Sequence, residues 1–178
     1  ATIVVKPPVE SSLISNENTI IGNTVLYGAT SGKLFAAGQS GERFAVRNSG
    51  AEAVIEGCDS NGCEYMTGGT VVILGKVGDN FAAGMTGGMA FIYDPNEEFE
   101  NYANPSSVIW QKPETDYWKN YLQNLISEHY EATHSKVAKK ILENIDREMS
   151  NFKQVCPKEM LDKLSKPLSS KSIIHKAV

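Results

Sequence analysis

The chain has 178 residues, of which 41% are hydrophobic and 21% charged, and its net charge is −4. This composition is typical of one globular domain, or of one domain with an appendage. The acidic balance argues against nucleic acid as a partner, and no run of about 18 apolar residues predicts a membrane span. The N-terminus lacks the charged head and apolar core of a signal peptide. We therefore expect a cytoplasmic protein, or one of the plastid or another organelle stroma in a eukaryote.

All 15 glycines lie between Gly22 and Gly88, and none of the seven prolines does. Short runs of β-favouring residues separate these glycines, as in 70–74 and 89–93. Glycine readily adopts the positive φ of a sharp corner, whereas each interior glycine costs a helix about 1 kcal/mol. This stretch is therefore predicted to form many short strands joined by tight corners. The glycines expected to be structural are Gly28, Gly38, Gly41, Gly50, Gly69, Gly75, Gly84 and Gly88.

The glycine-rich stretch also repeats itself. The sequence Phe-Ala-Ala-Gly at 35–38 returns at 81–84, 46 positions later. A shorter spacing of 19 residues joins Gly50, Gly69 and Gly88, and we give it less weight because its phase slips once along the chain. Stacked coils of a parallel β-helix repeat at about this length and bury a continuous apolar column. A β-propeller has a similar period, but two copies cannot close one. We predict an all-β core that forms a right-handed parallel β-helix, or solenoid.

Charge and periodicity change together near residue 110. Residues 1–110 carry 5 basic and 12 acidic side chains, whereas residues 111–178 carry 12 basic and 9 acidic ones. Apolar residues then recur at helical spacing in two segments, which are separated by the capping residue Ser135. We predict a β-helix over 1–110 and an α-helical hairpin appendage over 111–165, with its apolar faces packed together or against the solenoid end. A flexible tail is expected over 166–178.

The first predicted strand, over residues 2–5, begins the chain abruptly. A solenoid that starts in mid-strand exposes unpaired backbone groups at its end. We therefore expect further coils upstream of residue 1, so that the chain is part of a longer protein, and self-association through the exposed solenoid end. Further short strands are expected at 19–21 and 108–110, and an extended segment at 152–155.

One predicted strand carries two arginines. Period-two alternation places Phe44 and Val46 on one face of this strand. The opposite face would then carry Ala45 between Arg43 and Arg47. Two cations on an outer face beside several acids could make salt bridges to a neighbouring domain. The simpler alternative is that this face is only exposed to solvent. We keep interdomain contact by Arg43 and Arg47 as a hypothesis.

Residue types that carry chemistry form no recognisable arrangement. No P-loop motif is present, and Gly84–Gly88 lies between predicted strands rather than at the start of a helix, which disfavours a phosphate site. His129 and His134 flank a predicted helix end and make a poor metal pair. We assign no catalytic, cofactor-binding or metal-binding residue. An odd number of cysteines does not indicate a disulfide framework, and we expect reduced thiols at Cys58, Cys63 and Cys156.

Four longer segments nevertheless resemble a known family. They are Tyr27–Gly32, Glu42–Ala51, Asn61–Gly69 and Phe81–Gly88. Their sequences and order are similar to the C-terminal domain of the large (α) subunit of glutamate synthase. The likeness covers most of residues 1–155, including the helical stretch, and the run of several long segments makes it far more specific than any single glycine motif.

The resemblance implies a right-handed parallel β-helix and a parent enzyme that makes two L-glutamates from L-glutamine and 2-oxoglutarate. In that family an N-terminal amidotransferase domain releases ammonia, and a synthase domain carries FMN and an iron–sulfur cluster. Electrons come from a small NAD(P)H-oxidising subunit or from ferredoxin. The implied role of this domain is structural: it braces the glutaminase and synthase domains, holds no cofactor and is inactive alone.

Two alternatives stay open on the sequence. The same β-helix module occurs in a subunit of formylmethanofuran dehydrogenase, although the predicted helices after Tyr93 argue against that relative. The other alternative is a free-standing protein-binding scaffold.

Overall fold

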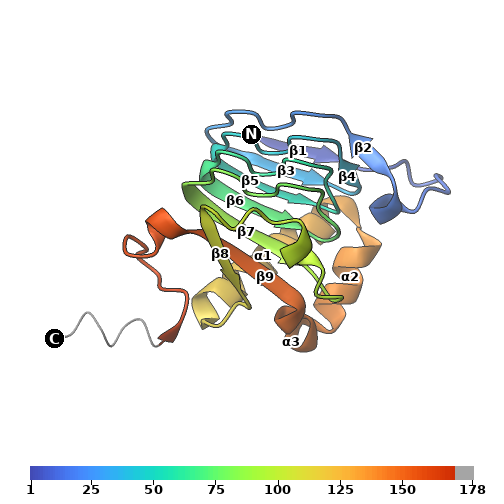
Figure 1. The fold of residues 1–178 in the computed structure, drawn as a ribbon. Coiled ribbons are helices and arrows are strands. Elements are labelled where there is room, and N and C mark those ends of the chain that lie inside the picture. Colours follow the sequence, from blue (N-terminus) through green and yellow to red (C-terminus); the bar gives the residue numbers. More distant parts are fainter. Residues whose placement is uncertain (171–178) are drawn as a thin grey trace.

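The computed structural model describes residues 1–170 and contains a solenoid of stacked coils with helices along one side (Figure 1). The strands are β1 (Thr2–Val5), β2 (Thr19–Ile21), β3 (Lys33–Ala36), β4 (Gln39–Ser40), β5 (Ser49–Ile55), β6 (Thr67–Ile73), β7 (Gly87–Tyr93), β8 (Val108–Gln111) and β9 (Phe152–Pro157). The α-helices are α1 (Asp116–Thr133), α2 (Lys136–Glu143) and α3 (Ile145–Glu148). Single 3-10 turns are η1 (Ser15–Glu17), η2 (Phe99–Asn101), η3 (Met149–Asn151) and η4 (Lys158–Met160). The predicted parallel β-solenoid with a helical C-terminal part is confirmed.

From β3 onward the coils repeat every 18 or 19 residues, whereas the first coil is longer, because Thr2 of β1 pairs with Lys33 of β3. Parallel pairing places Lys33 opposite Glu52, Glu52 opposite Thr70, and Thr70 opposite Met89. The 19-residue spacing of the glycines is therefore the structural period, and the greater weight given to the 46-residue repeat was wrong. The two Phe-Ala-Ala-Gly segments occupy different sides of a coil, because Phe35 lies in β3 toward the helices and Phe81 lies inside the solenoid.

Each coil contains one segment in which every second residue has a left-handed φ. These four left-handed segments are 24–28, 43–47, 61–65 and 80–84, with φ between 53° and 66° at the alternate positions. Backbone bonds join them across coils, for example from Ala45 N to Val25 O at 2.9 Å. The strand predicted around Arg43–Val46 is therefore wrong. Bonds to the coils on both sides offset a cost of about 1 kcal/mol for each strained residue.

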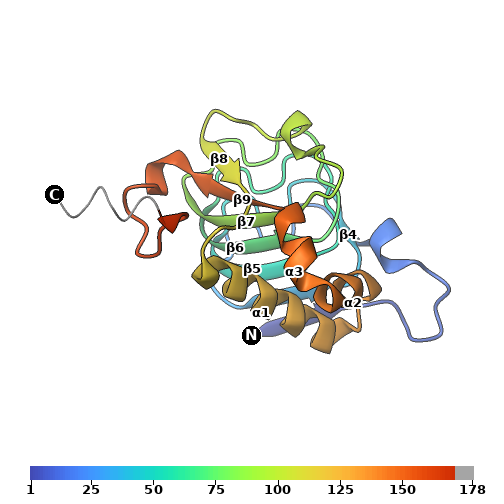
Figure 2. The same ribbon diagram turned by 90° about the horizontal axis from the view of Figure 1, so that it is seen from below.

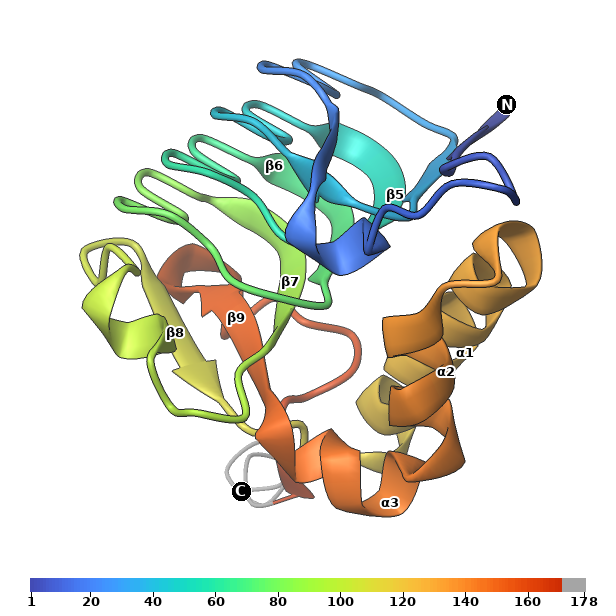
Figure 3. The same cartoon turned by 90° about the vertical axis from the view of Figure 1, so that its right-hand side faces the viewer.

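The sheet formed by β1, β3, β5, β6 and β7 is mainly apolar on both faces, as expected for parallel strands that are covered on both sides. The polar side chains of Lys33, Glu52 and Thr70 on it bond to residues of α1. One face fills the solenoid interior together with residues of the left-handed segments. The other face, which includes Phe35, Val54 and Val72, packs against α1 and α2. Figures 2 and 3 show these helices along the flank of the strands, with the stacked loops on the far side. The hairpin therefore lies on the lateral face rather than at the solenoid end, and its second helix ends at Glu143.

The chain returns to the sheet after α3. Strand β9 pairs antiparallel with both β7 and β8, so it covers the edge that the last parallel strand would otherwise expose. Strand formation at 108–110 and 152–155 is confirmed. The described part of the predicted tail, 166–170, packs against the body, because Leu168 is buried and Lys166 O accepts a bond from Trp118 Nε1. The remainder of the predicted tail lies outside the described residues. Within 1–170, no helix combines the length and apolarity needed to cross a membrane.

Candidate functional site

The left-handed segment 43–47 exposes both of its arginines. Arg43 and Arg47 point to solvent, whereas Phe44, Ala45 and Val46 between them are buried. Ala45 was predicted to share the arginines' face, and its burial corrects that expectation, because alternating left-handed residues do not follow the alternation of a strand. No acid among residues 1–170 forms an ion pair with either guanidinium. The two positive charges are therefore available to a partner.

An exposed tyrosine lies one coil further along the same surface. Arg47 N donates to Glu64 O at 3.0 Å, which places Tyr65 in the column of Arg47, and Tyr65 is 56% exposed. The tyrosine ring covers Gly84 of the next coil so closely that a Cβ there would collide with it. We call Arg43, Arg47 and Tyr65 the arginine face.

The eight glycines predicted to be structural fall into two groups, which differ in backbone conformation. Those with positive φ are Gly28, Gly38, Gly69, Gly84 and Gly88. The other three, Gly41, Gly50 and Gly75, have no room for a side chain between adjacent coils. A Cβ on Gly50, for example, would collide with the backbone carbonyl of Thr30. Gly28, by contrast, has open space around it, and Gly75 also lines the groove described below. The structural role of these eight glycines stays a prediction.

All three cysteines are free and buried. Burial raises the pKa of the Cys58 thiol to about 12 and that of Cys156 to about 11, and it raises the pKa of Cys63 well above its ordinary value. Because the thiolate is the reactive form, these thiols are protonated and unreactive near neutral pH.

The two histidines suggested as a weak metal pair are not brought together. His129 is buried, whereas His134 has a left-handed φ of 55° after the end of α1 and is exposed. Within the described part of the chain, no group of three or more His, Cys, Asp or Glu side chains is placed to hold a metal ion.

The sequence analysis missed a buried polar cluster around Glu56, whose side chain is fully buried. Ser15 Oγ donates to Glu56 Oε2 at 3.0 Å, and Ser135 Oγ donates to Oε1. His129 Nε2 lies 3.3 Å from the same Oε1. We call Ser15, Glu56, His129 and Ser135 the Glu56 cluster. It joins η1, the solenoid, α1 and the N-cap of α2 through one carboxylate, and its members are too far apart in sequence to give a local signal.

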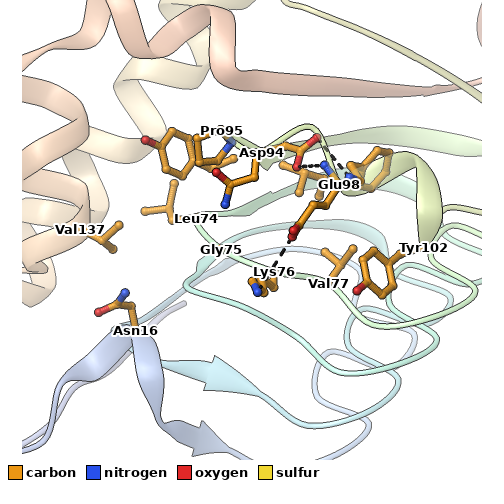
Figure 4. A pocket seen from close by; sticks show the side chains of 14 residues that line it. Asn16, Leu74, Gly75, Lys76, Val77, Asp94, Pro95, Glu98, Tyr102 and Val137 are labelled. Carbon is orange, nitrogen blue, oxygen red and sulfur yellow. Dashed lines mark hydrogen bonds and ion pairs between the residues drawn. The ribbon is translucent and has the colours of Figure 1, made fainter.

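Figure 4 shows a groove of about 200 Å³ whose lining includes Asn16 and Val137, which are one and two residues away in sequence from Ser15 and Ser135 of this cluster. Its apolar floor includes Leu74, Val77, Ile92 and Phe99, which are all buried. Asn16 of η1 and Val137 of α2 line two of its sides. At the rim, Lys76 Nζ lies 4.0 Å from a carboxylate oxygen of Glu98. The groove can therefore accept an apolar group, with Lys76 and Glu98 exposed at its rim. Asp94 also lines the groove, and its carboxyl oxygens accept hydrogen bonds from Glu98 N and Phe99 N.

Comparison with known proteins identifies relatives along most of the chain. The family model described as "GXGXG motif" matches residues 1–158. The chain is 62% identical over 167 residues to a glutamate synthase [NADPH] large chain of Azospirillum brasilense. This alignment covers 94% of this chain and 11% of that protein. It is 48% identical over 157 residues to a glutamate synthase [NADH] of Schizosaccharomyces pombe, covering 88% of this chain and 7% of that protein.

A third relative is the chloroplastic ferredoxin-dependent glutamate synthase of Spinacia oleracea, which is 47% identical over 155 residues, covering 87% of this chain and 10% of that protein. The chain thus spans about a tenth of the length of the curated relatives that it matches. Because the family model extends through the solenoid and on into β9, the chain belongs to the GXGXG motif family, whose members include segments of glutamate synthases.

Proposed function

We propose that the chain is the structural solenoid domain of a glutamate synthase large subunit and that it catalyses no reaction itself. The observation that carries this proposal is the 62% identity over 94% of the chain with a glutamate synthase large chain. The relatives match 155 residues or more, which includes the helical part, and this favours glutamate synthase over the β-helix subunit of formylmethanofuran dehydrogenase.

The internal structure of the solenoid supports a bracing role. Side chains fill its interior, and the largest of them, such as Phe44, Phe81 and Met66, are fully buried. Backbone bonds run from coil to coil on the strand side and in the left-handed segments. A stack of this kind is stiff along its axis, because each coil is packed against the next. It can therefore hold a glutaminase domain and an FMN and iron–sulfur synthase domain at a fixed separation.

The activity belongs to the proposed parent enzyme, which makes L-glutamate from L-glutamine and 2-oxoglutarate in the cytoplasm or in a plastid stroma. FMN and the iron–sulfur cluster lie in other domains of that enzyme, and this chain supplies none of their ligands. Its electrons come from a small NAD(P)H-oxidising subunit or from ferredoxin, and the names of the relatives include NADPH, NADH and ferredoxin.

The arginine face is the contact that we propose with a neighbouring domain. Residues 1–110 have a net negative charge, and Arg43 and Arg47 are exposed cations without an ion-pair partner among residues 1–170. Arginine and tyrosine are enriched where proteins bind one another, and both contribute strongly to the binding free energy. An acidic surface of the neighbouring domain would complement this face.

The test is a double charge reversal, Arg43→Glu with Arg47→Glu, in the full-length subunit. A matched control reverses Lys139 and Lys140, two exposed cations on α2. We expect the arginine variant to form less glutamate per glutamine hydrolysed, because ammonia transfer needs aligned domains, while the control keeps the original ratio. An unchanged ratio in the arginine variant would remove the arginine face from the proposal.

The non-catalytic role has its own test. The purified 178-residue chain should show no flavin absorbance after incubation with FMN and should form no glutamate from glutamine and 2-oxoglutarate. Bound FMN, detected by its absorbance after gel filtration, would contradict this role.

We also propose self-association of the chain through the open edge of β1. This strand pairs only with β3 among residues 1–170, and its side chains Ile3 and Val4 are 55% and 42% exposed. Unpaired strand edges of this kind are sites of strand addition. Sedimentation of the 178-residue chain should reveal a dimer that the substitution Val4→Lys abolishes, and a monomer at all concentrations would contradict the proposal.

A further inference from the structure

The groove beside the Glu56 cluster has the properties of a docking site. We propose that it receives one large apolar side chain, such as leucine or phenylalanine, from a loop of another domain of the parent polypeptide. This inference rests on the proposed function in one respect, which is that the chain is part of a longer polypeptide.

The size and lining of the groove define what it can bind. A volume of about 200 Å³ is comparable to that of one large side chain, and the buried floor residues Leu74, Ile92 and Phe99 present apolar atoms to it. Burying such a side chain contributes about 1.5–3 kcal/mol. The side chain of Lys76 is 84% exposed and that of Glu98 is 47% exposed, so both can still pair with polar groups of the incoming loop. The groove therefore suits an apolar side chain that is flanked by polar backbone.

The small size of the groove also indicates where its occupant comes from. A stable complex between free proteins buries about 1,200 Å² or more, which a groove for one side chain cannot supply. A segment of the same polypeptide is present at an effective concentration in the millimolar range, so a gain of a few kcal/mol is sufficient to keep it docked. The chain covers 11% of the length of its Azospirillum relative, which leaves most of such a polypeptide available as the source. A tethered loop therefore fits better than a second copy or a free protein.

The Glu56 cluster fixes two sides of this groove. Asn16 follows Ser15, and Val137 comes two residues after Ser135, and both serines donate to the same buried carboxylate. Gly75, which also lines the groove, packs against the backbone carbonyl of Glu56. The position of η1 relative to α2 thus depends on Glu56. We infer that Glu56 is a positioning residue, which sets the width of the groove without touching its occupant.

The decisive experiment is photo-crosslinking in the full-length subunit. Benzoylphenylalanine replaces Lys76 at the rim, and in the control it replaces Lys139, which is exposed on α2 and does not line the groove. We expect irradiation to join position 76 to a single apolar peptide outside residues 1–178, as identified by mass spectrometry. Position 139 should not label that peptide. Labelling confined to residues 1–178, to a second subunit or to no peptide would overturn the inference.

Two further variants test the groove itself. Val137→Trp should fill it and lower the yield of the cross-link from position 76 severalfold, and Glu56→Gln should lower the yield by loosening both sides. Thermal unfolding of each variant checks that the fold is retained, and an unchanged yield from a folded Val137→Trp variant would count against the groove. Glutamate formation distinguishes a failure of the groove inference from a failure of the proposed function. A subunit that forms glutamate but shows no cross-link contradicts the groove alone, and a cross-linked subunit that forms none contradicts the proposed function.

Discussion

From β3 onward, the strand side and the left-handed side of the coils stack by the same 18- or 19-residue step, but they bury different surfaces. On the strand side, β5, β6 and β7 are apolar on both faces, and α1 and α2 cover the outer one. On the left-handed side, only the inward residues are buried, and the outward ones include Arg43, Arg47 and Tyr65. The chain itself covers its strand side and leaves the outward residues of the left-handed side exposed.

The two sides also differ in how strain is tolerated. Ten residues other than glycine have a left-handed φ within the four left-handed segments, and glycine occupies such positions there only at Gly28 and Gly84. A side chain in this conformation costs about 1 kcal/mol, and the coil-to-coil backbone bonds offset that cost. On the strand side, by contrast, glycines such as Gly50 and Gly69 are required because the neighbouring coil leaves no space.

The largest loss of stability is expected at Glu56, which attaches α1, α2 and η1 to the strand side of the solenoid. Replacing Glu56 with Ala removes the acceptor of Ser15 and Ser135 and leaves His129 buried without its partner. Leaving a buried polar group without its hydrogen-bond partner costs about 1–3 kcal/mol, so the loss of all three contacts should cost about 3–5 kcal/mol in total. Urea unfolding should show this loss, and hydrogen exchange should rise in η1 and α2. The isosteric Glu56→Gln variant serves as the control and should lose less than half as much, whereas a loss below 1 kcal/mol for the Ala variant would show that the cover does not depend on this cluster.

Two glycine substitutions compare the sides directly. Gly69 in β6 has a φ of 81°, and a Cβ there would collide with the carbonyl of Ala51, whereas Gly28 has a φ of 61° and open space around it. Gly69→Ala combines overpacking with strain and should cost about 3 kcal/mol. Gly28→Ala carries the strain alone, which is partly offset by the lower entropy of the unfolded chain, and should cost about 0.5 kcal/mol. Equal losses in urea unfolding would contradict the difference in packing.

The sequence allowed the solenoid to be predicted because stacking leaves a periodic trace, as at Gly50, Gly69 and Gly88. The prediction of a strand at Arg43–Val46 was wrong because alternate residues of this segment adopt left-handed φ values, which are maintained by backbone bonds between coils. The position of the helices was missed, although the apolar runs of β5 and β6 already implied a second buried face. Nothing local marks Glu56, whose partners Ser15 and Ser135 are 41 and 79 residues away.

A smaller effect is expected at the end of β7, where Tyr93 Oη donates to Glu148 Oε2 at 2.6 Å. This bond is the main cause that lowers the pKa of Glu148 below 4.5, with a further contribution from Asn151. Its stabilisation is therefore complete above pH 4.5 and is lost as the pH falls through the lowered pKa of the folded state. Tyr93→Phe should cost about 1 kcal/mol at pH 7, and the difference from the original chain should vanish in acid.

The hydrogen bond between Tyr93 and Glu148 also stops stabilising the fold at high pH. Burial, followed by the bond to Glu148, raises the pKa of Tyr93 to about 12, so its contribution is complete below pH 10 and is lost as the pH rises through 12. Unfolding free energies of the chain and of Tyr93→Phe across both ranges check the two limits. A difference that does not change with pH would show that the hydroxyl acts through packing alone.

The smallest effect on stability is expected on the left-handed side, at Arg47. Its φ of 55° is one that glycine adopts without strain, and Gly28 and Gly84 occupy the same column in other coils. Arg47→Gly relieves about 1 kcal/mol of strain and loses a similar amount to the greater freedom of the unfolded chain. The free energy of unfolding measured in urea should therefore change by less than about 0.5 kcal/mol. In the full-length subunit the same variant should still lower the glutamate formed per glutamine, because the role that we propose for the exposed arginine is contact with a neighbouring domain. A large loss of stability would instead mean that Arg47 supports the stack, and the left-handed side would then lose its distinction as a surface left for contact.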